Sequence, residues 1–200
     1  MPALRAGSAV SASISSSAPA RRGTGKLLIA AAVGAAVSVS LGVYANVHQP
    51  TGEQILHVGF PSVLSMKAWL TTGVFVLALA QVVSALWMWE RLPRVTRPAP
   101  RWVVHAHRWT GTAAFLLSLP VAYHCLWSLG WRSTDVRVVL HGLFGCAFFG
   151  AFTVKMLALR IDGVSKWTLP VLGSALVAIL TAIWLTSSLW FFTNVGFPGL

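Results

Sequence analysis

Charged residues are scarce in this sequence, and acidic ones are the scarcest. Only 10% of the 200 residues are charged, and four of these are Asp or Glu. A soluble domain usually carries about 25% charged residues, whereas 56% of this chain is hydrophobic. The composition therefore argues against an ordinary soluble domain and indicates a membrane protein.

Several functional signatures are also missing. The sequence contains no P-loop, no dinucleotide fingerprint and no hydrolase triad, so it offers no nucleotide- or flavin-binding domain. The two cysteines, Cys125 and Cys146, lie inside apolar runs and outside any CxxC pair, which gives no disulfide framework. The net charge of +11 is spread between apolar runs and forms no basic stripe, so nucleic-acid binding is not expected.

Long apolar runs are what the sequence does contain, and each exceeds the roughly 20 residues that cross a bilayer. They predict an all-α integral membrane bundle of five transmembrane helices, in which the second to fifth form a four-helix core. Residues 1–25, rich in Ser, Ala and Arg, are expected to be a disordered cytoplasmic tail before a transmembrane domain at 26–197. The expected spans are 27–46, 63–89, 102–129, 137–159 and 167–193.

Lysine and arginine predict the orientation. Twelve of the 15 fall on the side of the N-terminus and three, Lys67, Arg132 and Arg137, on the other. Because positive loops stay in the cytoplasm, the N-terminus is expected there, in a multi-pass protein of the cell membrane whose C-terminus is external. The first span also resembles a signal peptide, but its apolar stretch is long for one, which favours a retained helix.

Two histidines interrupt the apolar sequence PVAYHCLWSLGWRSTDVRVVLHGLFGC at residues 120–146. His124 precedes a short polar loop and His141 follows it, each by about five residues, so both are expected about 7 Å inside the ends of adjacent helices. Ionisable residues inside a membrane mark function by default. Two imidazoles at equal depth can ligate one metal from opposite sides, although they can also serve as hydrogen-bonding glue between helices.

Helical spacing favours haem b over a Cys2His2 zinc or copper centre. Cys125 and Cys146 are turned about 100° and 140° away from His124 and His141 along their helices, so the four side chains would not converge easily. A haem needs the two imidazoles and a flat slot. Gly145, one turn after His141, provides room for one, and Pro120, one turn before His124, frees a carbonyl group.

The other candidate residues lie around this site or at the opposite face. Lys67 opens the second span and is the first candidate to bind the haem propionates, since it lies at the same external level. His107 repeats the His-x-x-x-Gly pattern of 141–145 but is about 26 Å from His124 along the helix, too far to share its site. It is expected to bind a quinone or other donor, or to cap the bundle; a second haem there would be one ligand short.

The motifs HRWTG, PVAYHCLW, HGLFGCAFFGAFTVKML, MKAWL and LWFFTNVGF resemble an uncharacterised family of small bacterial membrane proteins, a domain of unknown function, over most of residues 60–197. In outline the chain also resembles cytochrome b561-type and ferric-reductase-like haem-b membrane proteins. That resemblance implies electron transport, with His124 and His141, and less securely His107, as haem ligands. Those families usually have two complete histidine pairs, and this chain has one.

The sequence thus predicts a cytochrome b-like electron-transfer protein with one haem near the external side. Its partners would be the bilayer and a redox partner, either a quinone or an external electron-transfer protein; if it is a reductase, the donor chemistry lies on a partner. One alternative is a cofactor-free structural or assembly subunit of a membrane complex. Another is an external copper or zinc site that joins His57 to His124 or His141.

Overall fold

The computed structural model describes residues 18–55, 59–93, 95 and 97–196, with the backbone alone for residues 18–22. This part of the chain contains helices and loops and no strand. The long helices are α1 (Ala18–Val47), α2 (Val63–Met88), α3 (Arg101–Tyr123), α4 (Val136–Ala158) and α5 (Thr168–Trp184). Two π-helical segments continue α3 and α5, namely η1 (His124–Leu129) and η2 (Leu185–Leu189), and α6 (Trp190–Asn194) follows η2.

Five helices are long and apolar enough to cross a membrane, as the sequence predicted. The observed bounds differ from the expected spans by at most one residue, except at the start of α1. That helix begins at Ala18, inside the segment expected to be a tail, and residues 1–17 lie outside the described part.

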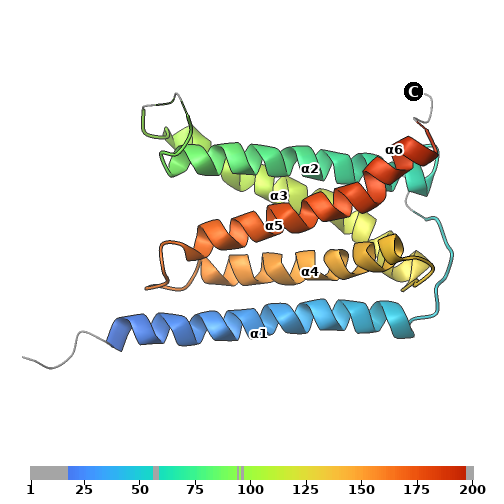
Figure 1. The fold of residues 1–200 in the computed structure, drawn as a ribbon, viewed down its shortest axis with the longest axis horizontal. Coiled ribbons are helices and arrows are strands. Elements are labelled where there is room, and N and C mark those ends of the chain that lie inside the picture. Colours follow the sequence, from blue (N-terminus) through green and yellow to red (C-terminus); the bar gives the residue numbers. More distant parts are fainter. Residues whose placement is uncertain (1–17, 56–58, 94, 96, 197–200) are drawn as a thin grey trace, which may run out of the picture.

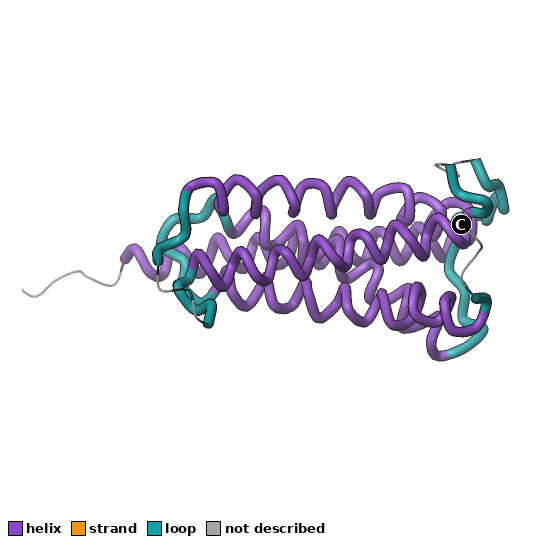
Figure 2. The backbone as a smooth tube through the Cα atoms, turned by 90° about the horizontal axis from the view of Figure 1, so that it is seen from above, coloured by secondary structure: helices purple, strands orange, loops and turns teal. Residues whose placement is uncertain are grey.

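The helices lie side by side in an elongated bundle (Figures 1 and 2). Helix α2 packs along α3, α4 packs along α5, and α2 also contacts α5, while α1 lies along α4 on the outside of this group. We call the end where α1, α3 and α5 begin the basic end, and the end where α2 and α4 begin the histidine end. Figure 1 shows the basic end on the left.

The centre of the bundle is filled by apolar side chains of α2 to α5. Its buried members are Val74, Ala78, Phe148, Leu176, Leu180 and Ile183, and Ala114 and Leu117 of α3 pack against them. This core is made by the four helices expected to form it, and it separates the two ends of the bundle.

Small residues bring α1 against α4. A Cβ atom added to Gly150 would overlap Ser38 and the carbonyl oxygen of Gly34, and one added to Gly34 would lie 2.6 Å from the carbonyl oxygen of Gly150. The Ser38 hydroxyl donates to the carbonyl oxygen of Cys146 over 3.1 Å. Such close backbone approach through glycine is a common way for membrane helices to associate. Helix α1 is therefore an integral fifth helix of this structure.

Helices α3 and α4 are joined by a short loop but make little close backbone contact within the described residues. Large rings lie between them instead. The Phe115 ring of α3 stacks on Phe152 of α4 at a centroid distance of 4.5 Å and meets Phe149 edge-on at 6.1 Å. The short loop suggested close neighbours, whereas α3 and α4 meet through these rings and not through close backbone contact.

Local signals set the ends of the hairpin that carries the histidines. Gly130, with φ of 65°, terminates η1 in a conformation that favours glycine. The carboxylate of Asp135 then caps α4 by accepting a hydrogen bond from the backbone N–H of Val138 at 3.0 Å. These two signals fix where the short loop begins and ends, and with it the depth of both histidines.

Candidate functional site

His124 is completely buried and is the first residue of η1. Its Nδ1 atom lies 2.9 Å from the carbonyl oxygen of Pro120, so Nδ1 carries the proton and donates it to that oxygen. The Nε2 atom then has a lone pair, and it has neither solvent nor a hydrogen-bond partner. A buried polar atom without a partner costs about 1–3 kcal/mol, and a neutral imidazole held in this way is a common metal ligand.

His141 is oriented by a hydroxyl group of α5's π-helical continuation. Its Nδ1 atom lies 3.3 Å from Oγ1 of Thr186. The Thr186 hydroxyl donates its own proton to the carbonyl oxygen of Ala182 at 2.7 Å, so it accepts from His141 Nδ1–H. The Nδ1 atom of each ring thus faces an oxygen acceptor. The Nε2 atom of His124 has no partner, whereas the His141 ring also lies against the Cys125 thiol.

Both π-helical segments contribute directly to this arrangement. His124 begins η1, and Thr186 lies in η2. π-Helical turns are rare and occur frequently at functional sites. Each turn here shifts the helix by a fraction of a turn at the level of the histidines, about 7 Å inside the ends of η1 and α4.

Arg137 fixes η2 to α4. Its Nη1 atom donates to the carbonyl oxygen of Thr186 at 2.8 Å, and its guanidinium group lies 4.1 Å from the ring centroid of Trp190. It also lies 3.8 Å from a carboxylate oxygen of Asp135. Because these contacts occupy the guanidinium group, Arg137 positions Thr186 and is a poor candidate for binding a ligand.

Lys67 and Cys125 lie close to His141. The Cys125 thiol is beside the His141 imidazole and within electrostatic range of the Lys67 ammonium group. Lys67, the cation expected to bind the haem propionates, therefore lies near Cys125 and the histidine end, whereas Arg132 is exposed in the loop. Helical spacing alone gave no sign that Cys125, in η1, and His141, in α4, would meet.

The second cysteine faces elsewhere. Cys146 lies on the side of α4 that meets α1, where its Sγ atom would be 3.8 Å from a Cβ atom added to Gly42. The described residues contain no group of three or more His, Cys, Asp or Glu side chains that could hold a metal ion. A Cys2His2 centre therefore has no support in this part of the chain.

Glycines distinguish the two His-x-x-x-Gly patterns. A Cβ atom added to Gly145 would meet no atom within 4 Å, so space is open one turn from His141. At Gly111 the equivalent space is taken by Gln81, whose Oε1 atom would be 3.1 Å from the added Cβ. A Cβ atom would therefore find room one turn from His141, whereas Gln81 fills the equivalent position near the basic end.

His107 belongs to the contact between α2 and α3. Its Nδ1 atom lies 2.8 Å from Ser84 Oγ, and its carbonyl oxygen accepts a hydrogen bond from Gln81 Nε2, which also donates to Thr110. Lys155 of α4 is within electrostatic range of the ring. These contacts fit a polar cluster that joins helices, and they include no second histidine.

His48, at the start of the first connection, packs among aromatic rings. Its ring stacks on Tyr44 at 5.0 Å and packs against Trp127 at 4.5 Å. Its Nε2 atom is buried without a partner. The backbone N–H of His48 donates a hydrogen bond to the carbonyl oxygen of Tyr44, which holds His48 against the end of α1. His57, proposed for an external metal site, lies outside the described residues.

Comparison with known proteins places the chain in a family. Residues 27–199 match the model of a family of unknown function, DUF6529. The chain belongs to this family. No curated protein and no solved structure matches it. Membership of DUF6529 agrees with the resemblance to an uncharacterised family, and it provides no link to the cytochrome b561-type proteins.

Proposed function

We propose that the protein is a membrane cytochrome b-like electron-transfer protein that holds one haem b between His124 and His141. The observation that carries the proposal is the Nε2 atom of His124, which is buried and has no hydrogen-bond partner. A buried polar atom without a partner lowers the stability of a membrane protein, and a ligand bound to that nitrogen would remove this destabilisation.

The surrounding residues support the same ligand. Bonds to Pro120 and Thr186 set the tautomers of both imidazoles, and such second partners orient metal-ligating histidines. The open position beside Gly145 favours a flat group over a single ion. Lys67 would provide a cation for a propionate. Bound haem supplies one-electron transfer, with a potential tuned by this environment.

One haem, not two, agrees with the structure around His107. Gln81 fills the position beside Gly111, and the His107 ring is engaged by Ser84. If the excess of lysine and arginine marks the cytoplasmic side, the haem lies near the external face. The redox partner would then be a quinone in the membrane or an external electron-transfer protein, reached from that face.

The test is a visible spectrum of the protein purified in detergent after expression with ample haem. We expect the sharp bands of a b-type haem in the reduced-minus-oxidised spectrum. His124→Ala and His141→Ala should abolish them, whereas His105→Ala, at an exposed position of α3, should leave them unchanged. A colourless wild-type protein would contradict the proposal.

The alternatives are a cofactor-free structural or assembly subunit and a copper or zinc protein. The cluster of His107, Ser84 and Gln81 favours a structural role for that histidine. Metal analysis of a colourless preparation would decide between the alternatives, since only the second would retain stoichiometric copper or zinc.

A further inference from the structure

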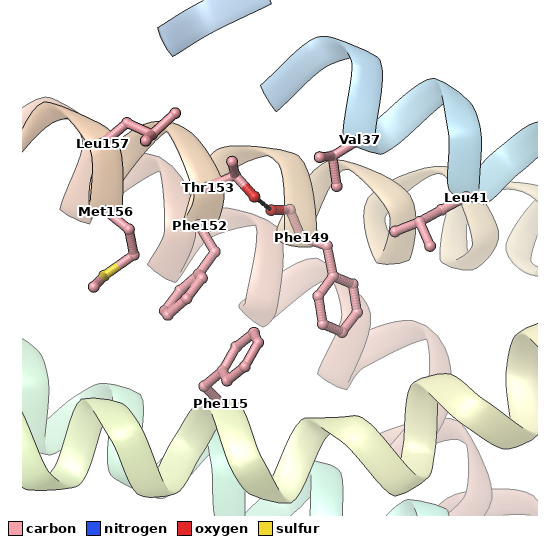
Figure 3. A pocket seen from close by; sticks show the side chains of 8 residues that line it. All are labelled: Val37, Leu41, Phe115, Phe149, Phe152, Thr153, Met156 and Leu157. Atoms are coloured by element: carbon pink, nitrogen blue, oxygen red, sulfur yellow. Dashed lines mark hydrogen bonds between the residues drawn. The ribbon is translucent and has the colours of Figure 1, made fainter. Parts of the chain in front are cut away.

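An apolar groove lies on the side of the bundle away from α2 and α5. It has a volume of about 400 Å³ and runs between α1, α3 and α4 around the middle of the bundle. The stacked rings of Phe115 and Phe152 form one wall of it, and Val37 of α1 forms another (Figure 3). The one hydroxyl group in its lining, that of Thr153, already donates to the carbonyl oxygen of Phe149 at 2.8 Å. The groove therefore suits a hydrocarbon chain.

Two of the helices that line the groove carry a cation on the same face, toward the basic end. Arg108 is seven residues before Phe115, and Lys26 is eleven residues before Val37. Spacings of seven and eleven residues return to nearly the same side of an α-helix. Lys26 and Arg108 thus lie in line with the groove, and a third cation, Arg160, lies in the turn that directly follows α4.

The three cations also lie at about one level. A Cβ atom added to Gly34 would be 2.6 Å from the carbonyl oxygen of Gly150, which fixes the register of the antiparallel helices α1 and α4. Lys26 is eight residues before Gly34, and Ala158 is eight after Gly150, so Lys26 is level with the end of α4, which Arg160 follows by two residues. Arg108 lies about 10 Å beyond Phe115, and the end of α4 about 9 Å beyond Phe152, the ring that stacks on Phe115.

These cations have no anionic partner of their own. All three side chains are exposed. Within the described ranges the one salt bridge joins Arg137 to Asp135, at the other end of the bundle. A hydrocarbon-shaped groove that ends in unpaired cations is complementary to an anionic amphiphile, and basic pockets between membrane helices commonly bind lipid head groups.

We propose that this groove binds one anionic glycerophospholipid from the leaflet at the basic end. An acyl chain lies against Phe115 and Phe152, and the phosphate group lies among Lys26, Arg108 and Arg160. This inference goes beyond the proposed electron transfer and does not depend on haem, because the groove and its cations are on a different part of the bundle from His124 and His141.

The test is native mass spectrometry of the full-length protein released from nanodiscs of phosphatidylcholine with increasing phosphatidylglycerol. We expect one phosphatidylglycerol to remain bound at collision energies that strip phosphatidylcholine. Arg108→Gln with Arg160→Gln should weaken that retention roughly tenfold to thirtyfold, the effect of two cations near a membrane surface. The double variant Arg97→Gln with Lys166→Gln removes the same charge from loops at the same end and should retain the lipid.

Thr153→Phe gives a second, uncharged test, since its ring would occupy the groove. It should reduce retention of phosphatidylglycerol while all three cations remain, and circular dichroism should show unchanged helix content. Equal retention of both lipids by the wild type, or equal losses in the two double variants, would overturn the proposal. Displacement of the lipid by millimolar inorganic phosphate would also overturn it, because the site would then recognise phosphate alone.

Discussion

The imidazoles of His124 and His107 have different hydrogen-bonding environments. The hydrogen bond found for the His124 ring is to a carbonyl group of its own helix, so removal of the ring would break no hydrogen bond between helices. His107, by contrast, bonds Ser84 of a neighbouring helix. The change in stability when each histidine is replaced should therefore distinguish a ligand from a structural histidine.

His124→Leu should leave the haem-free protein as stable as the wild type or stabilise it by about 1–3 kcal/mol, because it removes a buried atom without a partner. His107→Leu should destabilise the protein, because it leaves the α2–α3 cluster incomplete. Thermal unfolding in detergent, followed by circular dichroism, measures both. If His124→Leu were the more damaging change, His124 would be a structural residue and the proposed ligand role would fail.

Thr186 is expected to act on haem through His141. Thr186→Val removes the acceptor for Nδ1–H, and loss of such a partner typically weakens metal binding about 10- to 100-fold. A haem titration of the haem-free protein measures this change. Thr181→Val is the matched control, since the Thr181 hydroxyl bonds only the carbonyl oxygen of Val177 in its own helix. Equal haem affinities of the two variants would refute the role of Thr186.

At the scale of elements, the helix bounds were predictable because a run of about 20 apolar residues has few other outcomes in a membrane. The π-helical turns were not predictable, since they depend on contacts between distant segments. One such contact is the bond between Gly52 N–H and the carbonyl oxygen of Ser128 in η1. The contact of Cys125 with His141 and that of His48 with Trp127 also join distant segments, so they were not predictable from the sequence either.

The sequence contained part of the candidate site. Equal loop distances placed His124 and His141 at one depth, and Lys67 was expected at their level. It gave no indication that Gln81 would fill the space beside Gly111, because that requires the register of α2 against α3. The difference between the two His-x-x-x-Gly patterns therefore emerged only from packing.

The contact between α1 and α4 provides a prediction for an element. Gly150→Ala should destabilise the protein by about 1–3 kcal/mol, because the new methyl group would overlap Ser38 and Gly34. Gly73→Ala should be neutral or stabilising, since a Cβ atom there would meet nothing within 4 Å. Thermal unfolding of both variants measures the difference, and equal stability would show that α1 does not pack closely on α4.

At the scale of the whole molecule, the cations predict how the bundle is inserted. Twelve of 15 lysines and arginines lie toward the side of the N-terminus, so five spans should leave the C-terminus outside the cell. Alkaline phosphatase fused to the C-terminus should be active, since it folds only outside the cytoplasm, and a fusion after residue 98 should be inactive. The reverse pattern would place the histidine end in the cytoplasm.

The depth of the histidines has an electrical consequence. Moving one elementary charge across a membrane potential of 100 mV involves about 2.3 kcal/mol, but only a charge that travels through the hydrocarbon core senses that potential. His124 and His141 lie about one helical turn inside one end, and the core of Phe148, Leu176 and Leu180 separates them from the other. Electrons exchanged at that end would cross almost none of the field. Turnover there would be electrically silent, with a midpoint potential that does not follow the energised state of the membrane.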